Sequence, residues 1–385
     1  LKSKSFAELL MLNVDKAHEN MDSKRYINCL NGVIDINTNE LLPHDPKYKL
    51  DVRFNANFIL EDWKEKFNNS LFKVFLNDIL DKGSLETLQE SWGLMLSPHA
   101  KEVQNCFIYK GEGSNGKSTA CDIQEALIED SDLHICGIGL GDFGEDFVIS
   151  MAEGKFVNIV RDDELSGKTI HKFFKSMVCG DAVTINRKNR DLVRMPFNMT
   201  MFFGLNRMPS ASDKSVGFFR RPIIIPFDSS FGTEEEVAKG TRDKLKKVGL
   251  SDEIIEKELD LVFMWAYEGL QRLKTSKWEI TVSEASVKEM EEYREEADSS
   301  YAFFNDKVIS KKGERISKAI LYARYKSWCG EGTTPMNINQ FGRQLKSFGV
   351  KDFKSNSVKY WTDITYKLLT QVEKEESNPF TKEVQ

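Results

Sequence analysis

The segment from Phe107 to Ile123, FIYKGEGSNGKSTACDI, contains residue types that hold phosphate. Gly111, four further residues, and then Gly116, Lys117 and Ser118 have the spacing of a phosphate-binding loop. Glycines allow a tight turn that directs successive backbone N–H groups toward an anion. Lys117 would place positive charge at the β- and γ-phosphates, and the Ser118 hydroxyl would bind Mg²⁺. We therefore predict a site for ATP and Mg²⁺.

The sequence on either side of the loop favours this prediction over a glycine-rich surface turn. The apolar stretch NCFIY before it indicates a short buried strand, and ACDIQEALI after it indicates a helix whose positive end would face the phosphates. The motif requires a strand before the loop and a helix after it. The predicted nucleotide contacts are Gly111, Gly113, Ser114, Asn115, Gly116, Lys117, Ser118 and Thr119.

A second candidate segment, KFVNIVRDDELSG, is an apolar strand followed by three acids. Hydrolysis of a nucleotide needs one carboxylate to hold Mg²⁺ and another to orient the attacking water. We predict Asp163 for the metal and Glu164 for the water, with Asp162 as the alternative register. Three acids after a strand are also common in surface turns, and it is the preceding phosphate loop that favours the catalytic interpretation.

Two further candidate sites lie at the ends of predicted buried strands. Asn206 directly follows the stretch MTMFFGL, where its amide could sense the γ-phosphate or position water, or could simply begin the turn before Pro209. Arg220 and Arg221 precede the strand PIIIPF. Such a pair usually forms surface salt bridges, but in a ring-forming enzyme an arginine offered to the neighbouring subunit's nucleotide neutralises charge during phosphoryl transfer.

The segment NRKNRDLVR, residues 186–194, is a local basic region in an acidic chain. It carries four basic residues against Asp191, a local charge of +3, whereas the whole chain has a net charge of −6. Any nucleic-acid contact must therefore be local. We predict a hairpin whose tip contacts the DNA backbone through Arg187, Lys188 and Arg190, although such a tip is often only solvated.

Length and composition limit the class of protein. The chain has 385 residues, 40% hydrophobic and 30% charged, enough for two or three domains. No apolar run approaches the roughly 20 residues of a membrane span, and no signal peptide is recognisable. The six dispersed cysteines and scattered histidines indicate reduced thiols in the cytoplasm, without a zinc site. Because the first residue is leucine, we expect a piece of a longer protein.

The pattern of elements predicts an α/β fold in four parts. Residues 1–96 are expected to form a small α+β and helical module, with a hairpin around Asn37 to Asn39 and amphipathic helices from Trp63 to Leu96. Residues 97–248 alternate strands and helices, as an α/β nucleotide-binding core does. Residues 249–300 indicate a helical connector, and 301–385 indicate three helices followed by a hairpin.

The order of these segments resembles the superfamily 3 helicases, and more narrowly the phage, plasmid and poxvirus primase-helicases. The resemblance covers most of the chain, and its segments are GEGSNGKST, IVRDDE, KSMVCGDAVTINRK, MFFGLNRMP and FFRRPIIIPF. It implies an AAA+ P-loop core with a small N-terminal module and a C-terminal winged-helix-like domain. Two departures are VCGD, where the family more often has Thr-Gly-Gly-Asp, and Ser114, where it often has glycine.

The resemblance also implies a role for individual residues. Lys117 and Ser118 match the Walker A positions, Asp163 and Glu164 match Walker B, Asn206 matches sensor 1, and Arg221, with Arg220 beside it, matches the arginine finger. Lys175 matches an extra motif that leads into the pore hairpin and implies a contact to the neighbouring subunit. Lys188 matches the position of the lysine that contacts DNA in the family's pore hairpin.

As a whole, the resemblance implies an ATP-dependent helicase that forms a ring, usually a hexamer, and moves 3′ to 5′ on single-stranded or forked DNA. Its cellular setting would be the cytoplasm of an infected or element-carrying host, with a primase or polymerase domain on the same full-length chain. Two alternatives remain open: an initiator that uses ATP only to assemble on DNA, and a P-loop small-molecule kinase. The kinase would have no use for the basic hairpin or an arginine offered to a neighbour.

Overall fold

The computed structural model describes residues 23–163, 169–170, 173–185, 192–211, 213–330, 333–355 and 357–367. Four predicted site residues, Glu164, Arg187, Lys188 and Arg190, lie outside this range. The chain divides into two compact units. The first contains Leu1–Asp213 and Arg220–Met290, and the second contains Lys214–Phe219 and Glu291–Gln385.

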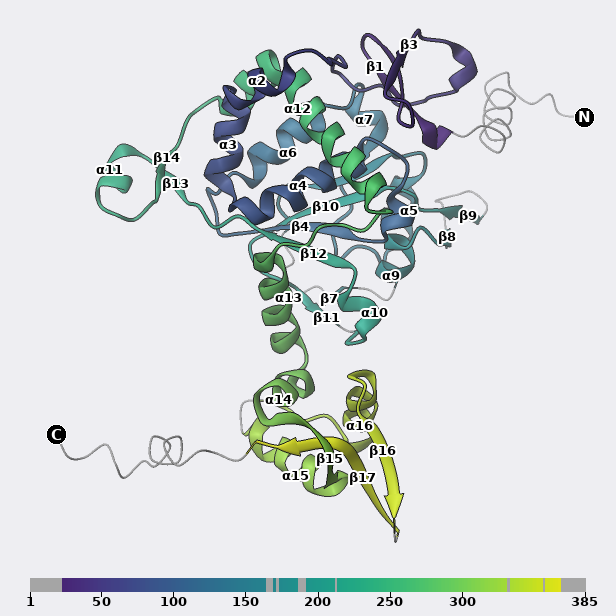
Figure 1. Ribbon diagram of the computed structural model, residues 1–385, viewed down its shortest axis with the longest axis vertical. Helices are drawn as coiled ribbons and strands as arrows, with labels where there is room; N and C mark the ends of the chain where they lie inside the picture. Colours follow the sequence, from purple (N-terminus) through teal and green to yellow (C-terminus); the bar gives the residue numbers. More distant parts are fainter. Residues whose placement is uncertain are drawn as a thin grey trace, which may run out of the picture. The chain divides into compact units, whose positions relative to one another are not determined.

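A parallel five-stranded sheet forms the centre of the first unit and confirms the predicted α/β class (Figure 1). Its order is β12, β4, β10, β6, β5. The strands are short and almost wholly buried, as expected for apolar runs covered on both faces. Their bounds are β4 Cys106–Lys110, β5 Ile135–Cys136, β6 Val157–Val160, β10 Thr200–Leu205 and β12 Pro222–Pro226.

The strand order decides which chain segments meet. β10 lies between β4 and β6, with Phe202 opposite both Phe107 and Ile159. Because parallel strands end at the same edge of a sheet, the phosphate loop after β4, the acids after β6 and Asn206 after β10 emerge side by side.

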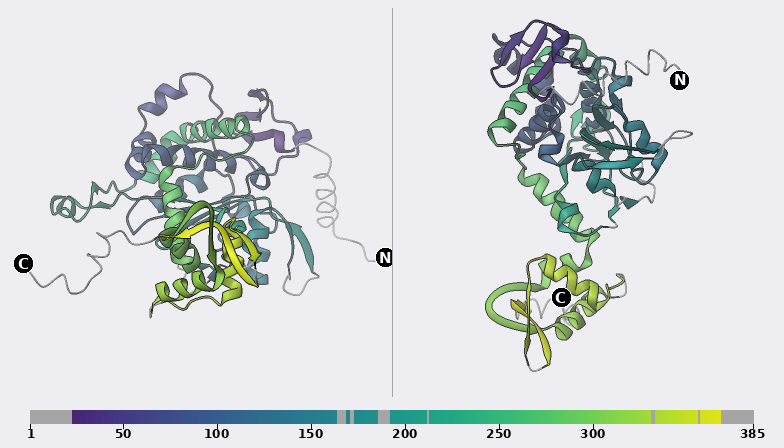
Figure 2. Two further views of the ribbon diagram at one scale, coloured as in Figure 1. Left: turned by 60° about the horizontal axis from the view of Figure 1, so that its bottom comes forward. Right: turned by 90° about the vertical axis from the view of Figure 1, so that its right-hand side faces the viewer.

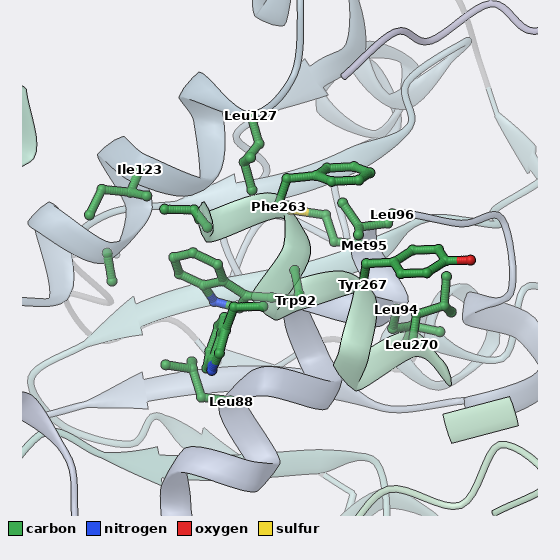
Figure 3. Packing of buried hydrophobic residues seen from close by; sticks show 14 of the residues in the cluster. Leu88, Trp92, Leu94, Met95, Leu96, Ile123, Leu127, Phe263, Tyr267 and Leu270 are labelled. Carbon is green, nitrogen blue, oxygen red and sulfur yellow. The ribbon is translucent and has the colours of Figure 1, made fainter. Parts of the chain in front are cut away.

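Three helices enclose one face of this sheet in a shared hydrophobic core: α4 Lys82–Met95, α6 Lys117–Ala126 and α12 Leu250–Thr275. Figure 3 shows Leu88 and Trp92 of α4 and Phe263 and Leu270 of α12 among the side chains of this core. The prediction that the long helix packs on the core is therefore confirmed. α4 and α12 thus belong to one core within the first unit.

The remaining elements of the first unit surround this core. The predicted hairpin around Asn37 to Asn39 is present as β2 and β3, within the purple N-terminal part of the ribbon (Figure 2). Its turn contacts α12, where Tyr267 Oη donates to Asn39 Oδ1 at 2.6 Å. The elements are β1 Tyr26–Cys29, β2 Gly32–Asp35, β3 Glu40–Leu42, α2 Trp63–Asn68, α3 Leu71–Ile79, α5 Ala100–Val103, α7 Ser131–His134, α8 Asp146–Ile149, β7 Thr169–Ile170, α9 Phe173–Val178, β8 Ala182–Ile185, β9 Val193–Pro196, β11 Ser210–Ala211, β13 Phe231–Gly232, α11 Glu234–Ala238 and β14 Lys244–Leu245.

The second unit has its own small core around Phe303, Tyr325, Phe341 and Trp361. The three predicted helices and the hairpin after them are present, and a strand that was not predicted, β15, follows the first helix. β15 is almost wholly exposed, so it lacks the apolar alternation that identifies a strand from sequence. The elements are α10 Val216–Phe219, α13 Glu284–Ala297, which crosses the division between the units, α14 Ser299–Lys307, β15 Val308–Ser317, α15 Lys318–Cys329, α16 Ile338–Ser347, β16 Lys351–Ser355 and β17 Val358–Tyr366.

Candidate nucleotide site

The loop between β4 and α6 has room only for glycine at two of its turns. A Cβ atom on Gly111 would lie 2.0 Å from Asn115 Nδ2 and 2.4 Å from the carbonyl oxygen of Phe227. Gly116 has a φ of +91°, and a Cβ there would lie 2.6 Å from Ile79 Cγ2. Both positions therefore hold the loop in a compact turn that other residues would disrupt.

This loop forms one side of a cavity of about 360 Å³, a size suited to a small ligand. The cavity brings together predicted site residues from three segments that are far apart in the sequence: the loop, the acid cluster and Asn206. Its lining residues are Phe75, Asp78, Gly113, Ser114, Asn115, Gly116, Lys117, Ser118, Thr119, Arg161, Asp162, Asn206, Phe231, Leu245, Lys246, Lys247 and Leu250.

Lys117 connects the loop to the strand beside it. Its buried side chain donates from Nζ to Asn206 Oδ1 at 3.0 Å, to Asn115 Oδ1 at 3.3 Å and to the carbonyl oxygen of Gly111. Burial lowers the pKa of Lys117, and the negative charge of Asp162 opposes that shift. The amine is thus held among oxygen acceptors at the cavity, where the phosphates of a nucleotide would give it a stronger anionic partner.

The first two acids after β6 occupy different surroundings. Asp162 is exposed and lines the cavity. Asp163, the residue predicted to hold the metal, is absent from the lining, and its Oδ2 accepts the backbone N–H of Leu140 at 2.7 Å. Its own N–H donates to the carbonyl oxygen of Gly204 at 2.9 Å. Asp163 therefore supports the neighbouring loop, and Asp162 is the carboxylate at the cavity.

The two arginines before β12 also differ in their surroundings. Arg221 is buried, its Nη1 makes a 3.4 Å contact with Gln104 Oε1, and its Nε has no hydrogen-bond partner among the described residues. Arg220 is exposed, and within the described parts of the chain its guanidinium has no recorded partner. Of the pair, Arg220 is the one whose side chain is accessible.

The remaining predicted contacts lie on and beside the basic hairpin. Its stem is present, because β8 pairs antiparallel with β9 from Ala182 opposite Pro196 to Ile185 opposite Val193. Its tip, with Arg187, Lys188 and Arg190, lies outside the described residues, as does Glu164. Lys175, on α9, forms an ion pair of 2.6 Å with Asp213 of the same chain.

Several cavity residues carry no sequence signal that would have identified them. Phe75 and Asp78 come from α3, and Phe231, Leu245, Lys246 and Lys247 come from a segment more than 100 residues after the loop. Apolar and lysine residues of this kind occur throughout the chain without a diagnostic spacing. Only the folded chain brings them to the phosphate loop.

Three family models match separate parts of the chain. "D5 N terminal like" matches residues 3–81, "Poxvirus D5 protein-like" matches residues 295–379, and a family of unknown function matches residues 109–221, between them. The last match includes the phosphate loop, the acids, Asn206 and both arginines. D5 models thus match the chain on both sides of this core, which supports the resemblance to the phage and poxvirus primase-helicases, a group of replication proteins.

Comparison with solved structures returns chains of low similarity. One is titled "The A form apo structure of NrS-1 C terminal region-CTR", with 13% identity and a TM-score of 0.42 over 80% of this chain and 77% of that chain. Another, "The apo structure of NrS-1 C terminal region (305-718)", has 12% identity and a TM-score of 0.42 over 84% and 80%. A search of curated proteins returns no significant match. None of the helices in the described part of the chain is long and apolar enough to cross a membrane.

Proposed function

We propose that the chain is an ATP-dependent DNA helicase that acts in replication as a ring of identical subunits, usually six, and moves 3′ to 5′ on single-stranded DNA. The observation that carries the proposal is the contact of 3.0 Å between Lys117 Nζ and Asn206 Oδ1, at a cavity that Asp162 also lines. A cation, a neutral amide and a carboxylate beside a phosphate loop are the groups that NTP hydrolysis requires.

The residues present fit a nucleoside triphosphate with Mg²⁺. The glycines at positions 111 and 116 allow the loop to turn compactly, and the backbone N–H groups at the start of α6 suit phosphate. We propose Ser118 and Asp162 as the metal ligands, which moves the metal role from Asp163 to the neighbouring acid. Mg²⁺, when bound, would offset the negative charge of the phosphates. Lys117 would hold the phosphates, Asn206 would orient water, and Glu164 would polarise it.

Arg220 is our candidate for the residue that acts on the neighbouring subunit's nucleotide. A guanidinium can perform that role only if it reaches beyond its own subunit, and Arg220 is exposed whereas Arg221 is buried. The resemblance pointed first to Arg221. The contacts of its side chain favour a structural role instead.

Two basic regions support DNA as the partner. The hairpin tip would form a ring of positive charge when six copies surround a central axis, a device that tracks the phosphate backbone without reading sequence. Residues 301–367 carry 13 lysines and arginines against 5 acids, a net charge of +8 in a chain of net charge −6. The element order there, helix, strand, two helices and a hairpin, supports the winged-helix interpretation.

The test is the ATPase rate per subunit as a function of protein concentration, with and without single-stranded DNA. We expect the rate to rise with both, and Lys117→Ala to abolish it. Arg220→Ala should be inactive alone and should reduce the rate of wild-type subunits mixed with it, by ~10³-fold at each affected site. Arg221→Ala should instead lower thermal stability. A rate indifferent to DNA and to concentration would contradict the helicase proposal.

A further inference from the structure

A small projecting segment, residues 230–249, lies against the cavity. We call it the arm; it leaves the sheet after β12, contains β13, α11 and β14, and returns to α12 (Figure 1). Its fold is held by its own contacts, because β13 pairs with β14 and Ser230 Oγ donates to Asp243 Oδ2 at 2.7 Å. A capping box, in which Thr233 and Glu236 bond to each other's backbone N–H, begins α11. The arm therefore has a defined shape.

The arm is attached directly to the phosphate loop. The N–H of Phe231 donates to the carbonyl oxygen of Ser114 at 2.7 Å, and Arg242 Nη1 donates to that of Gly113 at 3.2 Å. On its other side, Lys244 Nζ donates to the carbonyl oxygen of Asp78 at 2.6 Å and pairs with the carboxylate of the same residue at 3.2 Å. These contacts hold the arm between the loop and α3.

The cavity lining is chemically mixed. The loop contributes the side chains of Lys117 and Ser118. The elements outside the loop contribute charged residues, Asp78, Lys246 and Lys247, and four apolar side chains, namely Phe231 and Leu245 of the arm, Phe75 of α3 and Leu250 of α12. Apolar side chains beside a polar phosphate loop suit a nucleotide, because the flat base is the apolar end of that ligand.

The arm also brings lysines to the cavity, and one of them has no charged partner. Lys247 pairs with Glu253 at 2.8 Å, and Lys244 pairs with Asp78. Lys246 is exposed and lines the cavity, and no ion pair to it is recorded within the described residues. It is thus the lysine of the arm whose charge is available to a ligand.

We propose that the arm supplies the nucleobase half of the ATP site. The base lies against Phe231 and Leu245, opposite Phe75, and Lys246 gives the phosphates a second cation from the same subunit. This inference rests on the proposed function, since it names further contacts of the same nucleotide site. It also gives a role to the hydrogen bonds from the arm to the loop carbonyls of Gly113 and Ser114, which hold the arm beside the phosphate loop.

Matched variants separate the base from the phosphates. The ligands are MgATP and inorganic tripolyphosphate, which lacks a base, and the readout is affinity by calorimetry. Leu245→Ala is compared with Val248→Ala, whose side chain is 88% exposed and outside the cavity lining. Lys246→Ala is compared with Lys239→Ala, at the C-terminal cap of α11, where the Lys239 amine pairs with Glu235 at 2.5 Å. Because Leu245 and Lys246 are exposed, neither change should impair folding.

We expect Leu245→Ala to weaken the binding of MgATP by about threefold to tenfold, while the binding of tripolyphosphate stays unchanged. Lys246→Ala should weaken both ligands by about the same factor, with a smaller effect at high salt. Variants that bind MgATP as tightly as their controls would overturn the inference and leave the proposed function intact. A Leu245→Ala variant whose affinity for both ligands falls equally would do the same. A wild-type chain that binds neither ligand would instead overturn the proposed function.

Discussion

At the scale of the residue, the two adjacent carboxylates after β6 differ in their contacts, and we expect their substitutions to have different effects. Asp162→Asn should abolish Mg²⁺-dependent ATP hydrolysis with little change in stability, because its side chain is exposed at the cavity. Asp163→Asn should lower stability by about 1–3 kcal/mol, because its carboxylate accepts the N–H of Leu140. ATPase assays and thermal unfolding of both variants test this. Activity that survives in Asp162→Asn but is lost in a stable Asp163→Asn would restore the register predicted first.

At the scale of the element, the crossing of α4 and α12 depends on two glycines in contact with the opposite backbone. A Cβ on Gly93 would lie 2.3 Å from the N atom of Leu270, and one on Gly269 would lie 2.2 Å from the carbonyl oxygen of Gln89. Alanine in a helix interior is normally more stable than glycine by about 1 kcal/mol. Here we expect Gly93→Ala to destabilise the protein by about 2 kcal/mol or more, because the helices must separate.

Gly342, within α16, provides the matched control for this prediction. A Cβ there would meet only the Trp361 ring, at 3.8 Å, which is an ordinary contact. Gly342→Ala should therefore leave the free energy of unfolding unchanged or raise it. Denaturant unfolding of both variants measures the difference. If Gly93→Ala were as stable as Gly342→Ala, the close crossing of α4 and α12 would be wrong.

At the scale of the whole molecule, the accessibility of the cysteine thiols tests how tightly both compact units are packed. Burial raises the pKa of Cys121 and of Cys136 to about 12, and Cys29, Cys106 and Cys329 are also buried. Cys179 is partly exposed. A thiol reagent at pH 8 should therefore label Cys179 rapidly in the native protein and all six cysteines after denaturation. Mass spectrometry identifies the labelled sites, and rapid native labelling of Cys121 would contradict the packing of α6.

The raised pKa values of Cys121 and Cys136 also predict how the free energy of unfolding changes with pH. In the unfolded chain a cysteine ionises near pH 8.5, whereas folding raises the pKa of Cys121 and Cys136 to about 12. Their contribution to stability is fully present below about pH 8.5 and is lost as the pH rises toward 12. Replacing both by alanine should flatten this alkaline loss, which unfolding curves between pH 7 and pH 11 would measure.

The local pattern of residues determined the class of site and most of the elements that hold it. Glycine spacing, an apolar strand before it and a helix after it predicted the phosphate loop, because these features depend on neighbours in the chain. The hairpin around Asn37 to Asn39 and the strand ending at Leu205 were predictable for the same reason. The exposed strand β15 was not, since it has no apolar alternation.

Only the tertiary structure decided which side chains meet. The strand order places Asn206 beside Lys117, although 89 residues separate them. In the folded chain Asp162 lines the cavity, whereas Asp163 accepts a hydrogen bond from a neighbouring loop. The amino-acid sequence alone could not decide which of these two adjacent acids faces the cavity. The same holds for the buried Arg221 and the exposed Arg220, and for the arm that completes the cavity. Spacing along the chain fixes a local turn, whereas contacts between distant segments depend on how the whole core packs.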